Sequence, residues 1–104
     1  MIAFTALADP TRRQIVEMLA GGERTAGDIA SQFEVSAPAI SQHLKVLRQA
    51  RLVRVRAEAQ RRFYALDAAG IGEIDAWLRD IRRFWSGRLD ALEDQLRKSE
   101  GDTP

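Results

Sequence analysis

The spacing of apolar residues predicts helices in the first part of the chain. Apolar side chains recur every three or four residues, which is the period of a helix with one buried face. Asp9 and Pro10 mark the start of one such helix, because the aspartate can cap the first turn and proline suits the first helical position. Gly21 and Gly22 mark its end. A short helix over residues 2–7 is expected before it. The helix that begins at Asp9 and Pro10 is expected to carry Arg12, Arg13 and Glu17 on its outward side.

Two further helices are predicted with a very short connection between them. Thr25 begins the first, and Ser36 caps the second, which is expected to run from about Ala37 to Ala50. Three apolar residues of the second helix are expected to face the core: Ile40, Leu44 and Leu47. The side chains left outside, mainly near its N-terminal end, are small or form hydrogen bonds: Ala37, Pro38, Ser41, Gln42 and Lys45. This arrangement is typical of a helix-turn-helix.

After residue 50 the hydrophobic period changes from that of a helix to that of a strand. Residues 52–57 alternate apolar and basic side chains, residues 61–66 form a second extended run, and the polar residues 58–60 connect them. The two runs together predict a β-hairpin. Two arginines, Arg54 and Arg56, share one face of its first strand, and Arg61 and Arg62 follow the tip. No Asn-Gly or Asp-Gly pair fixes the type of turn, so the sequence leaves the register open.

A long amphipathic helix, capped by Asp67, is predicted over residues 68–98, and residues 99–104 are expected to form a disordered tail. Three glycines are expected to weaken the helix locally: Gly70, Gly72 and Gly87. Its apolar stripe is too large for so small a core to cover, so a two-fold partner is expected to bury the rest. The expected dimer interface comprises Phe4, Leu7, Ile74, Trp77, Leu78, Ile81, Phe84, Trp85, Leu89 and Leu92. The alternatives are that the helix folds over its own domain, or that its aromatic side chains line a ligand pocket.

Length and composition indicate a single folded domain, over residues 1–98. The chain has 104 residues, of which 45% are apolar and 30% are charged. The absence of cysteine removes disulfides and thiolate chemistry, and a single histidine excludes a multi-histidine metal site within one chain. No apolar run is long enough to cross a membrane, and the N-terminus does not resemble a secretory signal, so a cytoplasmic protein is expected.

The net charge is only +1, but the charged residues are unevenly distributed. Residues 36–62 contain seven basic side chains and one acidic side chain, whereas the segments before and after carry net charges of −2 and −3. A basic surface of this kind is typical of a protein that binds a polyanion. A solvated charged face is the alternative interpretation of the same pattern.

The helix after Ser36 and the basic hairpin together predict a DNA-binding surface. Small and hydrogen-bonding side chains at the start of a recognition helix can approach base edges in the major groove, and arginines at a hairpin tip can reach phosphates. His43 is expected to lie close to the DNA or to have a structural role as a half-buried helix residue. The expected DNA-binding residues are Ser36, Ala37, Pro38, Ser41, Gln42, His43, Lys45, Arg48, Arg54, Arg56, Arg61 and Arg62.

Two stretches carry a more specific signal: ADPTRR at residues 8–13 and SQHLKVLR at residues 41–48. Together they resemble the arsenic-repressor (ArsR/SmtB) family of bacterial winged-helix transcriptional regulators, and the resemblance extends from about Phe4 to Leu96. It implies a mainly α-helical winged helix-turn-helix fold with a small β-hairpin, and a homodimer built by the first and last helices. It also implies a repressor that occupies a palindromic operator in double-stranded DNA, near its own promoter.

The sequence departs from the metal-sensing members of that family. Some of those members carry a Cys-x-Cys type signature before the recognition helix, but residues 23–30 contain no thiol; others place Asp and His ligands on the last helix, which has no histidine here. The chain therefore resembles the metal-independent branch, whose last-helix pattern it shares at residues 76–78 (Ala-Trp-Leu) and 84–85 (Phe-Trp). No cofactor is expected, and no Gly-rich phosphate loop or Ser-His-acid set indicates an enzyme. Two alternatives stay open: a winged-helix protein-interaction module and a regulator that responds to a small ligand.

Overall fold

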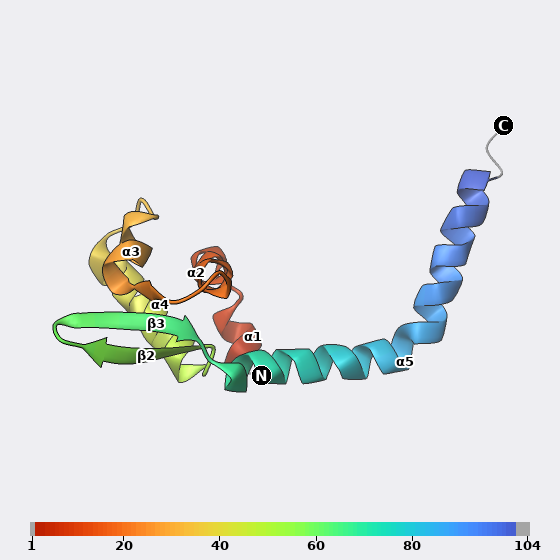
Figure 1. Cartoon of the computed structure of the whole chain (residues 1–104). Helices are drawn as coiled ribbons and strands as arrows, with labels where there is room; N and C mark the ends of the chain where they lie inside the picture. The colour runs from red at the N-terminus through yellow and green to blue at the C-terminus, as the bar shows by residue number, and fades with distance from the viewer. Residues whose placement is uncertain (1, 102–104) are drawn as a thin grey trace. The chain divides into compact units, whose positions relative to one another are not determined.

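The structure is a computed structural model that describes residues 2–101, without the side chains of Leu89 and Glu100. It divides into two compact units after Ile74. The elements are, in order, α1 (Ile2–Ala6), α2 (Pro10–Ala20), β1 (Arg24–Thr25), α3 (Ala26–Ser31), α4 (Ala37–Gln49), β2 (Val53–Glu58), β3 (Arg61–Leu66) and α5 (Ala68–Gly101) (Figure 1). The predicted fold, mainly helical with a small hairpin, is confirmed.

The predicted capping residues begin the helices. Asp9, Thr25 and Ser36 each accept a hydrogen bond from the backbone N–H three residues further on, at 3.1, 3.1 and 3.3 Å. Each bond satisfies an N–H group that has no partner within its own helix. Gly22, just beyond the end of α2, has a φ of +134°, a backbone conformation that only glycine adopts readily. The short-range signals in the sequence therefore place the helices correctly.

The sheet has three antiparallel strands in the order β1-β3-β2. The hairpin register runs from Val53 opposite Leu66 to Glu58 opposite Arg61. Its turn is therefore two residues long, not the three-residue connection over 58–60 that the sequence indicated. Ala59 has a φ of 55°, and this left-handed conformation allows the tighter turn. The sequence did not predict β1, whose two residues are too few to show an alternating pattern.

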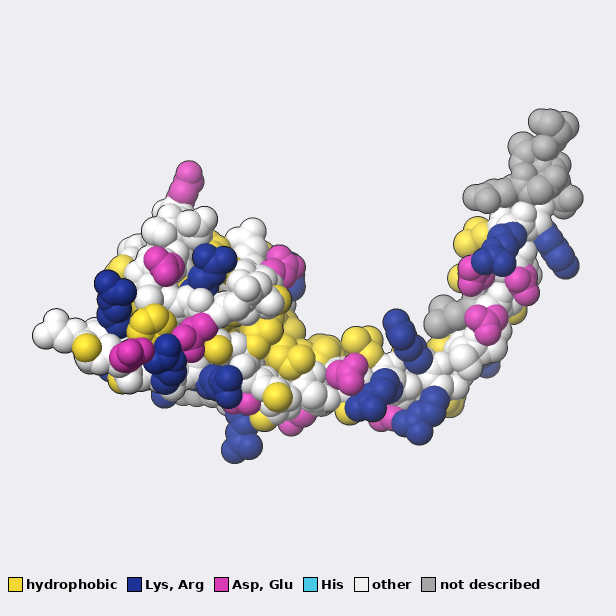
Figure 2. Space-filling model, in the orientation of Figure 1, with side chains coloured by type: hydrophobic (Ala, Val, Ile, Leu, Met, Phe, Trp, Pro, Cys, Tyr) yellow, Lys and Arg dark blue, Asp and Glu magenta, His cyan; other side chains and the backbone are white. Residues whose placement is uncertain are grey.

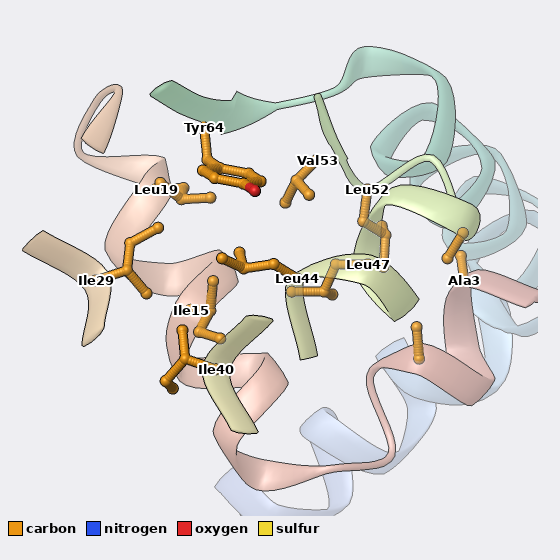
Figure 3. Packing of buried hydrophobic residues seen from close by; sticks show 12 residues of the cluster. Ala3, Ile15, Leu19, Ile29, Ile40, Leu44, Leu47, Leu52, Val53 and Tyr64 are labelled. Carbon is orange, nitrogen blue, oxygen red and sulfur yellow. The ribbon is translucent and has the colours of Figure 1, made fainter. Parts of the chain in front are cut away.

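The hydrophobic core of residues 2–74 lies between the helices and one face of the sheet (Figure 3). Its buried residues are Ala3, Ala6, Ile15, Leu19, Ile29, Ile40, Leu44, Leu47, Ala50, Leu52, Val53 and Tyr64. They include the whole predicted inner stripe of α4. Full burial of one such aliphatic side chain contributes about 1.5–3 kcal/mol to folding. No charged side chain of the described residues is buried, so this core positions α4 by apolar packing.

Gly70 allows the start of α5 to approach the turn that follows α4. Its backbone N–H donates to the Arg51 carbonyl at 2.7 Å. A Cβ atom at residue 70 would overlap that carbonyl and lie 2.9 Å from the carbonyl oxygen of Ala50. Arg51 itself has a φ of 58°. Gly70 is thus required by this close approach, a role that the sequence pattern did not indicate.

The last helix, α5, is longer than predicted. Asp67 caps it, as expected, by accepting a hydrogen bond from Ala69 N at 2.9 Å. The helix ends at Gly101 rather than at Lys98, so residues 99–101 of the expected tail are helical, while residues 102–104 lie outside the described part of the chain. Within residues 2–101, no helix combines the length and the apolar character needed to cross a membrane.

Candidate nucleic-acid interface

The exposed side of α4 begins at its N-terminal cap. The side chains predicted to face outward are all exposed: Ser36, Ala37, Pro38, Ser41, Gln42, Lys45 and Arg48. The opposite side of the helix is fixed in the core by its three buried residues. The first two turns of α4 therefore offer small and hydrogen-bonding groups on a helix whose orientation is set by packing. Such a surface has the shape and chemistry required of a helix that enters the major groove.

Three arginines of the hairpin form no ion pair within the described part of the chain. The side chains of Arg54, Arg61 and Arg62 are exposed, and they form no hydrogen bond or ion pair with any other residue of the described range 2–101, although the charge of Arg54 acts on Glu23 from a distance. Arg61 directly follows the turn, so β3 carries two of these cations at the hairpin tip. Cations without an internal partner are available to bind an anion such as a phosphate.

The fourth hairpin arginine, Arg56, is already paired. Its Nε and one terminal nitrogen donate to the two carboxylate oxygens of Glu23 at 3.0 and 2.6 Å, and the other terminal nitrogen donates to Glu58 at 2.7 Å. Its guanidinium carbon lies 4.4 Å from the centre of the Phe63 ring. Both the charge and the planar face of the Arg56 guanidinium are thus engaged by other residues of the chain, which makes Arg56 a weaker candidate for a phosphate contact than the other three hairpin arginines.

This pairing changes the protonation equilibria of both partners. Hydrogen bonds from Arg56 lower the pKa of the Glu23 carboxyl below its usual value of 4.5. The bonds to Glu23 and Glu58 raise the pKa of Arg56 further above its already high value. Figure 2 shows that acidic and basic side chains are interspersed on one face of the unit formed by residues 2–74. Glu23 has no local sequence signal, because it lies 33 residues before the arginine that it binds.

His43 turns toward α2 and not toward the exposed side of α4. Its side chain is half-buried, and its Nδ1 atom lies 3.3 Å from a terminal nitrogen of Arg12 and 4.0 Å from an Asp9 carboxylate oxygen. Arg12 was expected on the outward side of α2, but its Nε donates to the Ala6 carbonyl at 2.6 Å. The structure therefore favours the structural role of His43 over a direct phosphate contact.

Asp9 caps α2 and also lies close to His43 and Arg12. The backbone N–H of Arg12 lowers the pKa of the Asp9 carboxyl below its usual value of 3.8, and the positive charges of protonated His43 and of Arg12 act in the same direction. Asp9 is therefore ionised at neutral pH. It stabilises the start of α2, since a negative charge is favourable at a helix N-terminus.

The described residues contain no group of three or more His, Asp or Glu side chains that could hold a metal ion.

Two features of α5 are relevant to the alternatives left by the sequence. A hollow on this helix is lined mainly by charged and polar residues: Ala76, Arg79, Asp80, Arg82, Arg83 and Ser86. It does not include the aromatic side chains that were considered as the walls of a ligand pocket.

Most of the apolar stripe of α5 is exposed in the single chain. The exposed side chains range from Ile81, at 37%, to Phe84, at 77%, and include Trp77, Leu78, Trp85, Leu92 and Leu96. The two rings of Phe84 and Trp85 contact each other edge to face, with centroids 6.2 Å apart. Of the other predicted interface residues, Leu7 and Ile74 are partly buried against the core, Phe4 is half-buried, and the Leu89 side chain lies outside the described residues.

Comparison with known proteins links this geometry to one class of protein. Residues 9–55 match the profile of a family described as bacterial regulatory protein, arsR family. The chain is 49% identical over 100 residues to the HTH-type transcriptional regulator Rv2034 of Mycobacterium tuberculosis, covering 96% of this chain and 90% of that protein. It is 41% identical over 75 residues to the transcriptional repressor SdpR of Bacillus subtilis, covering 72% and 83% of the two chains.

Solved structures with the same fold include a possible transcriptional regulator for arsenical resistance, with a TM-score of 0.74 and 38% identity. That match covers 91% of this chain and 96% of the other. Another is the homodimeric winged helix-turn-helix DNA-binding domain of a possible ArsR-family regulator from Mycobacterium bovis. It has a TM-score of 0.64 and 28% identity, and the match covers 79% and 76% of the two chains.

Proposed function

Because this chain belongs to the arsR family of bacterial regulatory proteins, and is thus a winged helix-turn-helix transcriptional regulator and not an enzyme, we propose that it represses transcription as a homodimer bound to operator DNA. One observation carries this proposal: the exposed, small and polar start of α4 lies in the same compact unit as the unpaired arginines of the hairpin. A protein-binding face would favour aromatic residues at these positions.

The proposed contacts divide into two groups. Residues that approach base edges are Ala37, Pro38, Ser41, Gln42 and Lys45; residues that hold phosphates are Ser36, Arg48, Arg54, Arg61 and Arg62. Arg56 and His43 are left out of the second group because their side chains already bind other residues of the chain, Glu23 and Arg12 respectively. Repression follows from occupancy, since a bound dimer blocks access of polymerase to the promoter. Binding to operator DNA would place this activity in the cytoplasm.

The exposed apolar stripe of α5 supports the homodimer. A second copy would remove several large apolar side chains from water, and each contributes about 1.5–3 kcal/mol when fully buried. We propose that α1 and α5 provide this interface, and that the two recognition helices lie about 34 Å apart. That distance corresponds to one turn of DNA, so the operator is expected to be palindromic.

We propose that the regulator does not sense metals. The chain has no cysteine and one histidine, and that histidine is engaged with Arg12. The acidic residues of α5 are interleaved with arginines, with which several form ion pairs: Asp75 with Arg79, Asp80 with Arg83, and Glu93 with Arg97. A measurement of operator affinity with and without zinc tests this point, and no change is expected.

A gel-shift titration tests the main proposal. The purified protein is expected to bind the DNA upstream of its own gene more tightly than a random duplex of equal length at physiological salt. With about six to eight charge contacts per dimer, the logarithm of the affinity should fall steeply with the logarithm of the salt concentration. Equal affinity for the two duplexes at physiological salt, or an affinity that does not change with salt, would contradict operator binding. Equal affinity would instead favour a winged-helix protein-interaction module.

A further inference from the structure

The side chain of Arg12 joins three helices. It leaves α2, donates from Nε to the carbonyl of Ala6, which is the last residue of α1, and approaches His43 of α4 with a terminal nitrogen. The two distances are 2.6 and 3.3 Å. The Ala6 carbonyl is among the last carbonyls of its helix, which lack a partner inside the helix and are commonly bound by a basic side chain. We call Arg12 with these two acceptors the Arg12 bridge.

The contact with His43 requires one protonation state of the imidazole. A guanidinium has only N–H donors and no acceptor. The Nδ1 atom of His43 must therefore be the acceptor, so it carries no proton, and the proton of the neutral ring is on Nε2. A doubly protonated imidazole has donors on both nitrogens, and it would place two positive groups against each other. The bridge can close only while His43 is neutral.

Asp9 offers a second partner to the protonated ring. Its carboxylate oxygen lies 4.0 Å from His43 Nδ1, so a small shift would turn this approach into a charged hydrogen bond. The same oxygen now caps α2 through the backbone N–H of Arg12. On the other elements that pack against α4, α1 has no ionisable side chain, and neither Asp28 of α3 nor any charged residue of β2 forms a hydrogen bond or an ion pair with His43. His43 therefore has two alternative partners, Arg12 when the imidazole is neutral and Asp9 when it is protonated.

We propose that Arg12 and His43 are positioning residues for α4, and that the Arg12 bridge couples the end of α1 to the recognition helix only while His43 is neutral. Acidification breaks the hydrogen bond from Arg12 to His43, and the protonated His43 binds Asp9 instead. The contacts that hold α4 against α1 and α2 are then different. DNA affinity then falls on acidification, as His43 takes up a second proton. The expected effect on DNA binding rests on the proposed function, whereas the bridge itself does not.

The sign of this pH effect distinguishes the bridge from a direct phosphate contact. If His43 touched DNA, its protonation would add a positive charge beside a phosphate, and acidification would increase the affinity. The bridge predicts the opposite. Loss of one hydrogen bond of typical net strength corresponds to a loss of about five- to tenfold in affinity.

The first experiment compares the wild-type protein with His43→Asn in binding a fluorescent duplex of the protein's own upstream DNA. The Asn side chain has an oxygen where His43 has Nδ1, so it can accept from Arg12 at every pH, and the two residues have similar helix propensities. The wild type is expected to bind about five- to tenfold more weakly at about pH 5.5 than at about pH 7.5. His43→Asn is expected to keep the affinity that the wild type has at the higher pH, while His43→Ala is expected to bind weakly at both.

Three results would overturn the proposal. They are a wild-type affinity that rises on acidification, a pH profile of His43→Asn that matches that of the wild type, and His43→Ala binding as tightly as His43→Asn. Failure to bind any duplex at about pH 7.5 would instead contradict the proposed function.

A second experiment needs no DNA. His43 is the only histidine of the chain, so the imidazole nitrogens give an unambiguous signal in a long-range ¹⁵N NMR spectrum. While His43 is neutral, the wild type is expected to show a proton on Nε2 and an acceptor at Nδ1. Arg12→Lys retains the positive charge but cannot span both acceptors, so the preference for this tautomer should weaken while circular dichroism shows the same helix content. A proton on Nδ1 in the wild type, or an unchanged tautomer ratio in Arg12→Lys, would contradict the bridge.

Discussion

At the residue scale, Arg56 shows how one contact changes the meaning of a charge pattern. The sequence places four arginines in the hairpin, and their number favours phosphate binding. In the structure Glu23 and Glu58 surround Arg56, so this site carries no excess positive charge. The remaining arginines, Arg61 among them, are exposed without such partners. Two of the three hairpin arginines without an ion pair, Arg61 and Arg62, lie at the hairpin tip.

This difference predicts unequal effects of two substitutions on the salt dependence of DNA binding. Arg61→Ala should weaken binding to all duplexes alike and reduce the slope of log affinity against log salt by about 1 per protomer, because one phosphate contact is lost. Arg56→Ala should leave the slope nearly unchanged, because its charge is balanced internally. Fluorescence anisotropy over a range of salt concentrations measures both slopes. Equal reductions for the two variants would show that Arg56 does contact phosphate.

The same ion pair predicts a pH dependence of stability. The pKa of Glu23 is lowered in the folded protein, so its carboxylate form is favoured by folding. The stabilisation is complete above the usual pKa of 4.5, and it is lost as the pH falls through the lower pKa of the folded state. Glu23→Gln should therefore lose less stability than the wild type between about pH 5 and pH 3. Urea unfolding at a series of pH values measures this difference, with the exposed Glu17→Gln as the control, and parallel profiles for wild type and Glu23→Gln would contradict the assignment.

At the scale of the elements, the starts of the helices follow from local chemistry, whereas their mutual contacts do not. Asp9 and Ser36 act on backbone groups three residues away, so the sequence predicts their roles. The bonds from Arg12 to His43 and from Arg56 to Glu23 join residues 31 and 33 positions apart, and no periodic pattern reports them. The inward and outward sides of α4 were predictable because one apolar stripe decides both.

Gly70 and Gly72 provide a matched test of packing against helix propensity. Both are glycines in the first turns of α5, but a Cβ at Gly70 would overlap the Arg51 carbonyl, while nothing lies within 4 Å of a Cβ at Gly72. Gly70→Ala should destabilise the protein by about 1–3 kcal/mol through overpacking, and Gly72→Ala should stabilise it by up to about 1 kcal/mol. The midpoints of urea unfolding measure both effects. Stabilisation by both substitutions would show that the close approach at Gly70 is absent in solution.

At the scale of the whole molecule, the apolar surface of α5 supports the proposed homodimer. A monomer would expose large side chains such as Trp77, Phe84 and Leu92 to water along one helix. The core of residues 2–74 is complete without them. The exposed part of the stripe is therefore not needed for the core, so a substitution there can separate folding of the DNA-binding unit from association of two copies.

Ile81→Glu is the substitution that tests this separation. It places a charge in the middle of the exposed stripe, so we expect the wild type to sediment as a dimer at micromolar concentration and the variant to sediment as a monomer. Circular dichroism of the variant should still show the folded DNA-binding unit, because Ile81 is not part of the core. Its operator affinity should fall far more than its affinity for random duplex, since specific binding needs two recognition helices held one DNA turn apart. Arg82→Ala, one residue further along the helix, serves as the control and should remain dimeric. A wild-type protein that sediments as a monomer would remove the basis for a palindromic operator.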